Sequence, residues 1–166
     1  MTIDIVPVTV ANLEIVLPLI AEYQRFYQVE PDDTRNRIHF RRLATAPSQG
    51  AQWLAVDATG QGVGFVTAYR VLSSTLAVER CLLNDVYVVP PLRGQGLGRR
   101  LILHCAEWAI AEGYNGVYWR TAADNHTAQR LYDALPTQRK TWIDYTLDRE
   151  AYQRAMAEQS DGKGPA

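Results

Sequence analysis

The spacing of apolar positions along the chain changes between the period of a strand and the period of a helix. Apolar and polar positions alternate at residues 3–8, which predicts an opening strand. Apolar residues recur every three or four positions at residues 11–27 and again at 96–112, which predicts two amphipathic helices. Residues 34–46 are predicted as a further, more polar helix.

A run of strands follows, predicted at residues 51–57, 62–72 and 80–90. The first two are joined by Ala-Thr-Gly-Gln, a composition typical of a hairpin turn. The C-terminal part continues with a short buried strand, a helix, a last strand and a terminal helix, at residues 116–122, 125–135, 140–147 and 148–159.

This order of elements predicts a mixed α/β domain, rather than a regular strand–helix–strand repeat or a helical bundle. The chain has 166 residues, close to the commonest length of a single domain. No internal repeat and no long linker divides it. We therefore predict one domain at residues 1–159, followed by a flexible tail at residues 160–166.

The composition favours a globular protein with a local binding site. Hydrophobic residues make up 47% of the chain and the net charge is −1, whereas general nucleic-acid binders usually carry a basic excess. We therefore expect no nucleic acid partner. Cys81 and Cys105 fit no metal-ligand spacing, so we expect no metal and two reduced thiols. Because no signal-like or membrane-spanning run is visible, we expect no membrane partner and a cytoplasmic location.

One junction stands out chemically, because residues 90–100 place three glycines and three arginines between a predicted strand and a predicted helix. The first turn of a helix has unpaired amides and a partial positive charge, so a phosphate fits there. The spacing lacks the lysine and hydroxyl of a mononucleotide-binding loop and the third glycine of a dinucleotide-binding loop. The alternative is a glycine-rich turn that only caps the helix.

The same segment resembles the GNAT superfamily of N-acetyltransferases. Arg93, Gly96 and Gly98 match its pattern Gln/Arg-x-x-Gly-x-Gly/Ala. A second family pattern, Asn-x-x-Ala-x-x-Leu-Tyr, is matched from Asn125 to Tyr132. The order of elements agrees over residues 2–148, and the details look most like the branch with yeast histone and polyamine acetyltransferases and bacterial relatives. Leu135-Pro136-Thr137 departs from the Leu-Gly-Phe segment of many members, which puts the path into the last strand in doubt.

The resemblance implies the GNAT acyl-CoA N-acyltransferase fold, with a mixed central sheet of about six to seven strands, splayed in the middle and flanked by helices. It also implies acetyl-CoA as cosubstrate, with its pyrophosphate at the glycine junction and its pantetheine arm paired along a strand edge. Asn125 either caps its helix or binds that arm, or does both. The expected acetyl-CoA-binding residues are Val86, Tyr87, Val88, Arg93, Gly94, Gln95, Gly96, Leu97, Gly98, Arg99 and Asn125.

Acetyl transfer needs a neutral amine, stabilisation of an oxyanion and a proton for the departing thiolate. By the resemblance, the Tyr132 hydroxyl is the acid, although its place on an apolar stripe also suits a packed core tyrosine. The Val86 amide is the expected oxyanion donor. For the base, Asn84 would orient a water or the amine, whereas Asp85 is either the base or a buried structural group. Water alone is the third alternative for the base. Because side chains alternate along a strand, we expect Asn84 and Asp85 on opposite faces.

The expected function is acetyl transfer from acetyl-CoA to a primary amine, in a ternary complex. The acceptor classes left open are a small-molecule amine, an amino acid, a polyamine and a protein lysine. The first two predicted helices and the loop between them carry carboxylates and aromatic rings that suit a cationic amine, although arginines lie nearby. The carboxylates are Glu22, Glu30, Asp32 and Asp33, the rings are those of Tyr23, Phe26 and Tyr27, and the arginines are Arg25, Arg35 and Arg37. A non-catalytic acyl-CoA sensor is the alternative function. The resemblance also favours a homodimer.

Overall fold

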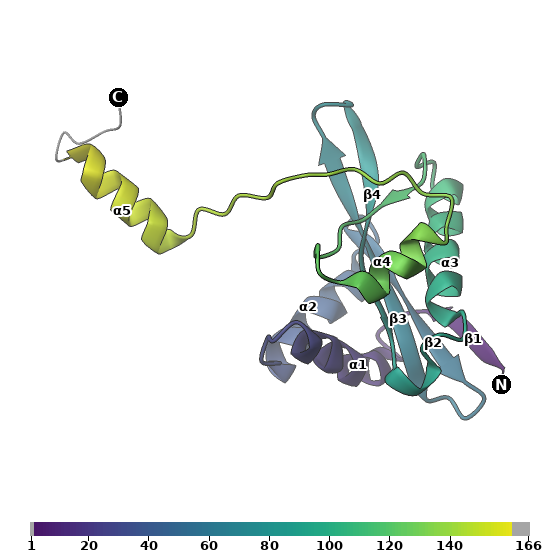
Figure 1. The fold of residues 1–166 in the computed structure, drawn as a ribbon. Helices are drawn as coiled ribbons and strands as arrows, with labels where there is room; N and C mark the ends of the chain where they lie inside the picture. Colours follow the sequence, from purple (N-terminus) through teal and green to yellow (C-terminus); the bar gives the residue numbers. More distant parts are fainter. Residues whose placement is uncertain (1, 161–166) are drawn as a thin grey trace. The chain divides into compact units, whose positions relative to one another are not determined.

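The computed structural model describes residues 2–160 and divides by internal contacts into two units (Figure 1). The N-terminal unit ends at Ala134, and the C-terminal unit begins at Leu135. None of the helices within residues 2–160 is both long and apolar enough to cross a membrane.

A five-stranded sheet forms the centre of the N-terminal unit. Its strands lie in the order of the sequence: the first three neighbouring pairs are antiparallel and the last pair, β4–β5, is parallel. The strands are β1 (Ile3–Pro7), β2 (Gly50–Asp57), β3 (Gly62–Ser73), β4 (Val78–Val88) and β5 (Val117–Tyr118). The mixed α/β class is confirmed, but the expected count of six to seven strands is wrong by at least one within the described residues.

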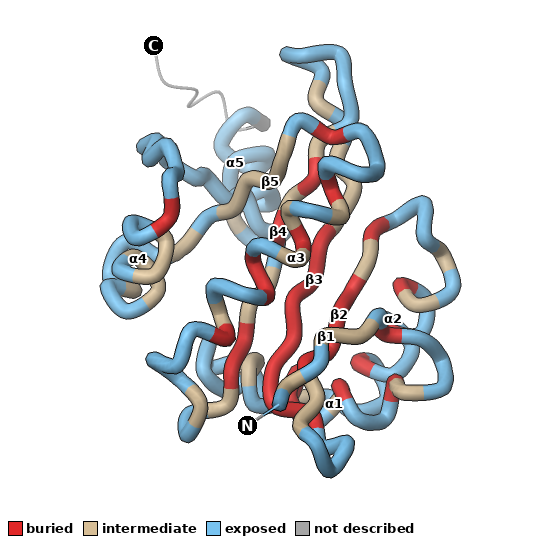
Figure 2. The backbone as a smooth tube through the Cα atoms, turned by 90° about the vertical axis from the view of Figure 1, so that its right-hand side faces the viewer, coloured by how far each residue is buried: buried red, intermediate tan, exposed pale blue. Residues whose placement is uncertain are grey.

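Helices cover both faces of this sheet (Figure 1). Two of them pack on one face, α1 (Leu13–Phe26) and α2 (Asp33–Thr45), and α3 (Leu97–Ala111) packs on the other. The 3-10 turn η1 (Pro90–Leu92) precedes α3, and α4 (His126–Asp133) ends the unit. Because neither face meets water, the central strands β2 and β3 are buried almost continuously instead of alternating (Figure 2).

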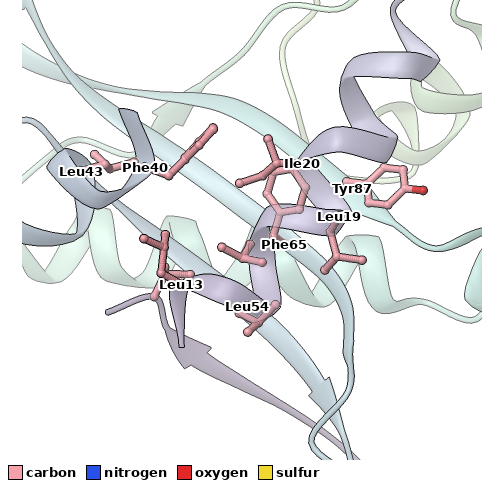
Figure 3. Packing of buried hydrophobic residues seen from close by; sticks show 10 residues of the cluster. Leu13, Leu19, Ile20, Phe40, Leu43, Leu54, Phe65 and Tyr87 are labelled. Carbon is pink, nitrogen blue, oxygen red and sulfur yellow. The ribbon is translucent and has the colours of Figure 1, made fainter. Parts of the chain in front are cut away.

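The core lies between α1 and the sheet (Figure 3). Ile20 of α1 packs with Leu54 of β2 and Phe65 of β3, all almost fully buried. On the opposite face, the Trp53 ring meets the Trp108 ring of α3 at a centroid distance of 5.1 Å. Burial of each such side chain stabilises the fold by about 1.5–3 kcal/mol. The core therefore fixes α1 and α3 on opposite sides of β3 and β4.

A β-bulge interrupts the register between β3 and β4. Thr67 is opposite Asp85 and Ala68 is opposite Leu83, so Asn84 has no partner residue on β3. A bulge leaves one residue outside the ladder and changes the direction of neighbouring side chains. This bulge lies on the segment that was expected to carry the chemistry.

Strand β5 is much shorter than the seven residues predicted for it. It pairs with β4 at only two positions, Cys81 with Val117 and Leu82 with Tyr118. Beyond these pairs β4 continues for six residues, to Val88, with β3 as its neighbour on one side. The edge of β4 towards β5 is therefore open from Leu83 onwards, which agrees with the splayed sheet that the resemblance implied.

The C-terminal unit contains one regular element within the described residues, α5 (Arg149–Ser160). The strand predicted at residues 140–147 is not formed, and residues 136–148 are exposed without regular structure. The alternating pattern of this segment is typical of a strand, but a strand needs a neighbouring strand for its backbone hydrogen bonds, and this unit supplies none. The predicted tail begins at Ser160, and residues 161–166 lie outside the described part of the chain.

Candidate active site

The glycine junction forms an open cradle at the N-terminus of α3. Gly94 and Gly96 have φ angles of +77° and +84°, the left-handed region that favours glycine. A Cβ atom at either position would meet no protein atom within 4 Å. The Arg100 amide donates a helical hydrogen bond to the Gly96 carbonyl at 3.1 Å. The amides before Arg100 therefore precede the helical hydrogen bonds and can receive an anion.

The three arginines of this junction have different roles. Arg93 Nε donates to the Val88 carbonyl at 2.9 Å, and its guanidinium lies over the Tyr87 ring at 5.5 Å. Arg100 donates to the Ile3 carbonyl at 2.8 Å. Arg99 is exposed. All three arginines keep their positive charge near the cradle, and Arg93 and Arg100 in addition bond to backbone carbonyls.

The side chains between these arginines point away from the cradle. Gln95 Nε2 donates to the Pro91 carbonyl at 3.0 Å. Leu97 is only 3% exposed and belongs to the core. A Cβ at Gly98 would lie 3.1 Å from Leu131 Cδ2, so glycine here lets α4 approach α3. At these positions the backbone, rather than the side chains, faces the predicted ligand.

A cavity of about 260 Å³ lies where β4 and β5 separate. It is lined by Val71, Leu82, Leu83, Asn84, Tyr118 and Arg120. Beyond it runs the open edge of β4, which includes Val86 and Val88. An open edge offers amides and carbonyls to an extended ligand with amides of its own, as a pantetheine arm has.

Two predicted residues lie on α4 or at its start. The Asn125 side chain accepts from the Ala128 amide at 3.2 Å and so caps the helix, one of the two roles expected for it. The Tyr132 ring packs edge-on against Trp119 at a centroid distance of 5.3 Å. Burial, together with the nearby Tyr27, raises the pKa of the Tyr132 hydroxyl above its ordinary value. Tyr132 therefore keeps its proton at neutral pH, as a general acid must.

A second cavity, of about 300 Å³, lies between the first two helices and the sheet. It is lined by Ile20, Tyr23, Gln24, Arg35, Asn36, His39, Phe40, Phe65, Tyr69, Asn84 and Asp85. We call it the Asp85 cavity, because Asp85 is the one carboxylate among these residues. Aromatic faces and one acid in a recess are a suitable environment for a cationic amine.

Asp85 lies deep enough for its charge to be costly. Burial raises the pKa of its carboxyl above the ordinary value of 3.8, against hydrogen bonding from Asn84, Tyr23 and Thr67. Asp85 in turn affects two nearby tyrosines. Burial is the larger cause and the negative charge of Asp85 the second, and together they raise the pKa of Tyr69 to about 12 and also raise the pKa of Tyr23. A carboxylate with a raised pKa is better matched to proton abstraction near neutral pH.

The expectation that Asn84 and Asp85 face opposite sides of the sheet is wrong. Both line the Asp85 cavity, and Asn84 Nδ2 donates to Asp85 Oδ1 at 3.0 Å. The bulge at Asn84 explains this, because alternation of side chains holds only while the ladder is regular. The two residues therefore form one polar pair at the cavity wall.

The carboxylates first considered for the acceptor site lie elsewhere. Glu22 accepts from the Tyr87 hydroxyl at 2.7 Å, and Asp32 caps α2 by accepting from the Arg35 amide at 2.9 Å. Arg37 forms two hydrogen bonds with Glu14, at 2.9 and 2.7 Å. Among the arginines in α1 and α2, Arg35 reaches the Asp85 cavity.

Several residues of the cavity were not singled out from the sequence. Gln24 and Asn36 exchange hydrogen bonds of 2.8 and 2.7 Å and join α1 to α2, and His39 Nε2 lies 3.1 Å from the Tyr69 hydroxyl. The sequence does carry a weak indication of this contact, because the polar residue Asn36 lies on the same face of α2 as the apolar residues Phe40 and Leu43. A buried amide on an apolar stripe needs a partner, which indicates a contact with another element.

Comparison with known proteins identifies the chain. The model of the acetyltransferase (GNAT) family matches residues 17–135. The chain belongs to this family. It is 35% identical over 136 residues to the D-amino-acid N-acetyltransferase HPA3 of Saccharomyces cerevisiae, covering 80% of this chain and 78% of that protein. It is also 28% identical to the uncharacterized N-acetyltransferase YhfO of Bacillus subtilis, over 80% of this chain and 89% of that one.

Solved structures support the same fold. An aminoglycoside N-acetyltransferase, AAC(6')-Iy, in complex with CoA superposes with a TM-score of 0.77 at 19% identity, over 89% of this chain and 95% of that one. A probable acetyltransferase gives the same TM-score at 24% identity, over 87% and 97%. The GNAT protein described here is an enzyme that transfers an acetyl group from acetyl-CoA to an amine, and the sensor alternative is not favoured.

The residues present fit acetyl-CoA. The open space above Gly94 and Gly96 and the amides at the start of α3 suit a pyrophosphate. The free edge of β4 suits the amides of the pantetheine arm. Bound there, the cosubstrate supplies an activated acetyl group.

Proposed function

We propose that the acceptor is a free amino acid, whose amine enters the Asp85 cavity and whose carboxylate meets Arg35. The observation that carries this proposal is that one partly buried acid, Asp85, and one arginine line the same cavity. The Arg35 side chain is 82% exposed and lies 3.4 Å from Asp32, so it can turn to an incoming anion at little cost. A polyamine or a peptide lysine would bring no carboxylate to use it.

The similarity to a D-amino-acid N-acetyltransferase supports the same class of acceptor. The size of the cavity agrees, since about 300 Å³ is at the lower end of small-molecule pockets and suits a compact ligand. Neither argument distinguishes the two enantiomers, so both belong in the test.

We assign the chemical roles as follows. Asp85 accepts the proton of the ammonium group, directly or through a water that Asn84 orients. The Val86 amide stabilises the oxyanion, and the Tyr132 hydroxyl donates a proton to the departing sulfur. The amides at the start of α3, with Arg99 nearby, hold the pyrophosphate. Both substrates are bound together, and transfer is direct.

The carboxylate of the acceptor is the part to test. We expect the enzyme to acetylate D- or L-amino acids with a lower KM than the matching amines that lack the carboxylate. Arg35→Gln should raise KM for the amino acid roughly 3- to 10-fold, a modest effect because the guanidinium is solvated. The same variant should leave KM for the decarboxylated amine unchanged.

Arg37→Gln is the matched control, because Arg37 lies on the same helix but is bound to Glu14 instead of lining the cavity. Initial rates of thiol release measure all of these values. Equal KM values for the amino acid and its decarboxylated amine in the wild-type enzyme would overturn the proposal.

Two further properties are part of the proposal. We place the enzyme in the cytoplasm, because Cys81 and Cys105 are free buried thiols, as intracellular proteins keep them. We also propose that it forms a homodimer. Support for the dimer comes from apolar residues of the C-terminal unit that are exposed in the single chain, including Tyr152 of α5.

A further inference from the structure

The cavity that lies where β4 and β5 separate has a mainly apolar wall, and we call it the β4–β5 cavity. Its lining comprises Val71, Leu82, Leu83 and Tyr118, which are apolar or aromatic, and the polar residues Asn84 and Arg120. No carboxylate is among these residues. A recess of this composition favours an uncharged apolar group, because binding there removes apolar surface from water.

The β4–β5 cavity and the Asp85 cavity lie on the same face of the sheet. Tyr69 lines the Asp85 cavity and Val71 the β4–β5 cavity, and side chains two positions apart on a strand share a face. The register pairs Tyr69 with Leu82 and Leu82 with Tyr118, and residues paired across strands also share a face. Because Asn84 lines both cavities, one small molecule can reach into both of them.

The aromatic part of this wall is held in place by an arginine. The Arg80 guanidinium lies over the Tyr118 ring, 3.7 Å from its centroid, which is a cation–π contact. This contact restrains the ring, so the cavity is preformed on that side. The positive charge of Arg80 also disfavours a second cation at the ring, and the amine of an acceptor is therefore better placed at Asp85.

The volume of the β4–β5 cavity sets the size of the group that it can take. A water molecule occupies about 30 Å³ in the liquid, so a cavity of about 260 Å³ has room for on the order of ten heavy atoms. The side chain of leucine, methionine or phenylalanine fits within this volume. The hydrogen of glycine or the methyl group of alanine would leave the apolar wall in contact with water.

We propose that the β4–β5 cavity binds the side chain of the acceptor and selects amino acids with large, uncharged apolar side chains. The inference rests on the proposed function in one respect, that the amine of the acceptor enters the Asp85 cavity. An amino acid held in this way has its amine at Asp85, its carboxylate at Arg35 and its side chain beyond Asn84, against Leu82 and Tyr118.

A series of acceptors tests the preference in the wild-type enzyme, with initial rates of thiol release as the measurement. We expect kcat/KM to rise roughly tenfold or more from glycine to methionine and phenylalanine, because added apolar groups of a substrate bind in a matching pocket. Glutamine has nearly the length of methionine but a polar end, and its kcat/KM should be roughly tenfold lower than that of methionine.

Filling the cavity should remove this preference. Val71→Phe should lower kcat/KM for phenylalanine roughly tenfold more than for glycine, because the new ring takes the space of the substrate side chain. Leu82→Phe fills the same cavity from β4 and should act in the same direction. Leu72→Phe is the matched control, because Leu72 follows Val71 on β3 but lies on the opposite face, 81% exposed, and should not change the ratio.

Amines that lack the carboxylate separate this inference from the proposed function. If phenylethylamine is preferred over methylamine and Val71→Phe abolishes the preference, the cavity has the inferred role, whether or not a carboxylate improves binding. Equal kcat/KM for glycine and phenylalanine, a preference for glutamine over methionine, or an unchanged ratio of phenylalanine to glycine in both filling variants would each overturn the inference. Absence of turnover with every one of these amines would overturn both proposals.

Discussion

At the scale of single residues, one unpaired position decides the chemistry of the acceptor cavity. With a regular ladder, Asn84 and Asp85 would face opposite sides of the sheet. The bulge at Asn84 instead brings both to the same wall, where Asp85 is partly buried beside aromatic residues and desolvation raises the pKa of its carboxyl. The proposed base, Asp85, and Asn84, which we propose orients a water or the amine, are therefore neighbours in sequence and in space.

We predict that Asp85→Asn lowers kcat at neutral pH roughly 10²–10⁴-fold, the usual contribution of a general base. The acidic limb of the rate profile, which for the wild type should lie above pH 3.8, should disappear in the variant. Asp57→Asn is the control, because Asp57 caps the turn after β2 and should leave kcat unchanged. An acidic limb that persists in Asp85→Asn would exclude Asp85 as the base.

The same two variants have opposite effects on stability. The folded-state pKa of Asp85 is raised, so the folded chain binds this proton more tightly and stability is lost as pH rises from 3.8 through the raised value. Asp85→Asn should therefore gain in Tm relative to the wild type over that window. The Thr59 hydroxyl and nearby amides lower the pKa of Asp57, so Asp57→Asn should be less stable at neutral pH, with a deficit that shrinks in acid.

At the scale of elements, the start of α3 is the site that we propose for the pyrophosphate of the cosubstrate. The turn η1 and two glycines in the left-handed region bring unpaired amides to the end of β4. The side chains of this segment contribute less to the expected phosphate site than the sequence suggested, because Arg93 and Gln95 donate hydrogen bonds to nearby backbone carbonyls. We therefore expect the backbone at this helix end to make most of the contacts with the pyrophosphate.

We predict that Gly96→Ala weakens CoA binding roughly tenfold, equivalent to about 1.4 kcal/mol. The left-handed backbone would also cost about 1–2 kcal/mol for a residue with a Cβ. Gly60→Ala is a close control, because Gly60 has the same φ of +84° with open space around it, in the turn between β2 and β3. Both variants should lose similar Tm. Calorimetry showing equal CoA affinity for the two would contradict this role of Gly96.

The elements themselves could be predicted well where they depend on local pattern. The order from β1 to α4 and the glycine junction followed from apolar spacing and from the family patterns. The bulge could not be predicted, because one extra residue in β4 is visible only against its register with β3. Residues 140–147 show the same limit, since their alternating pattern is typical of a strand but a strand also requires a neighbouring edge, which their own unit does not supply.

At the scale of the whole molecule, the sheet places two functions at β4. Towards β5 its edge is open, where we propose that the cosubstrate binds, and at the bulge its side chains line the Asp85 cavity, where we propose that the amine binds. Asn84 lines both the Asp85 cavity and the cavity between β4 and β5, so the two spaces meet at this residue. An acetyl group and an amine can therefore approach each other from opposite sides of one strand.

The most direct test of acetyl transfer at this place is a product balance with purified enzyme, acetyl-CoA and an amino acid. We predict one CoA thiol for each N-acetylated amine, no thiol without the amine, and a much slower reaction for Tyr132→Phe with CoA affinity retained. CoA that binds without forming acetylated amine, or full turnover by Tyr132→Phe, would contradict the account.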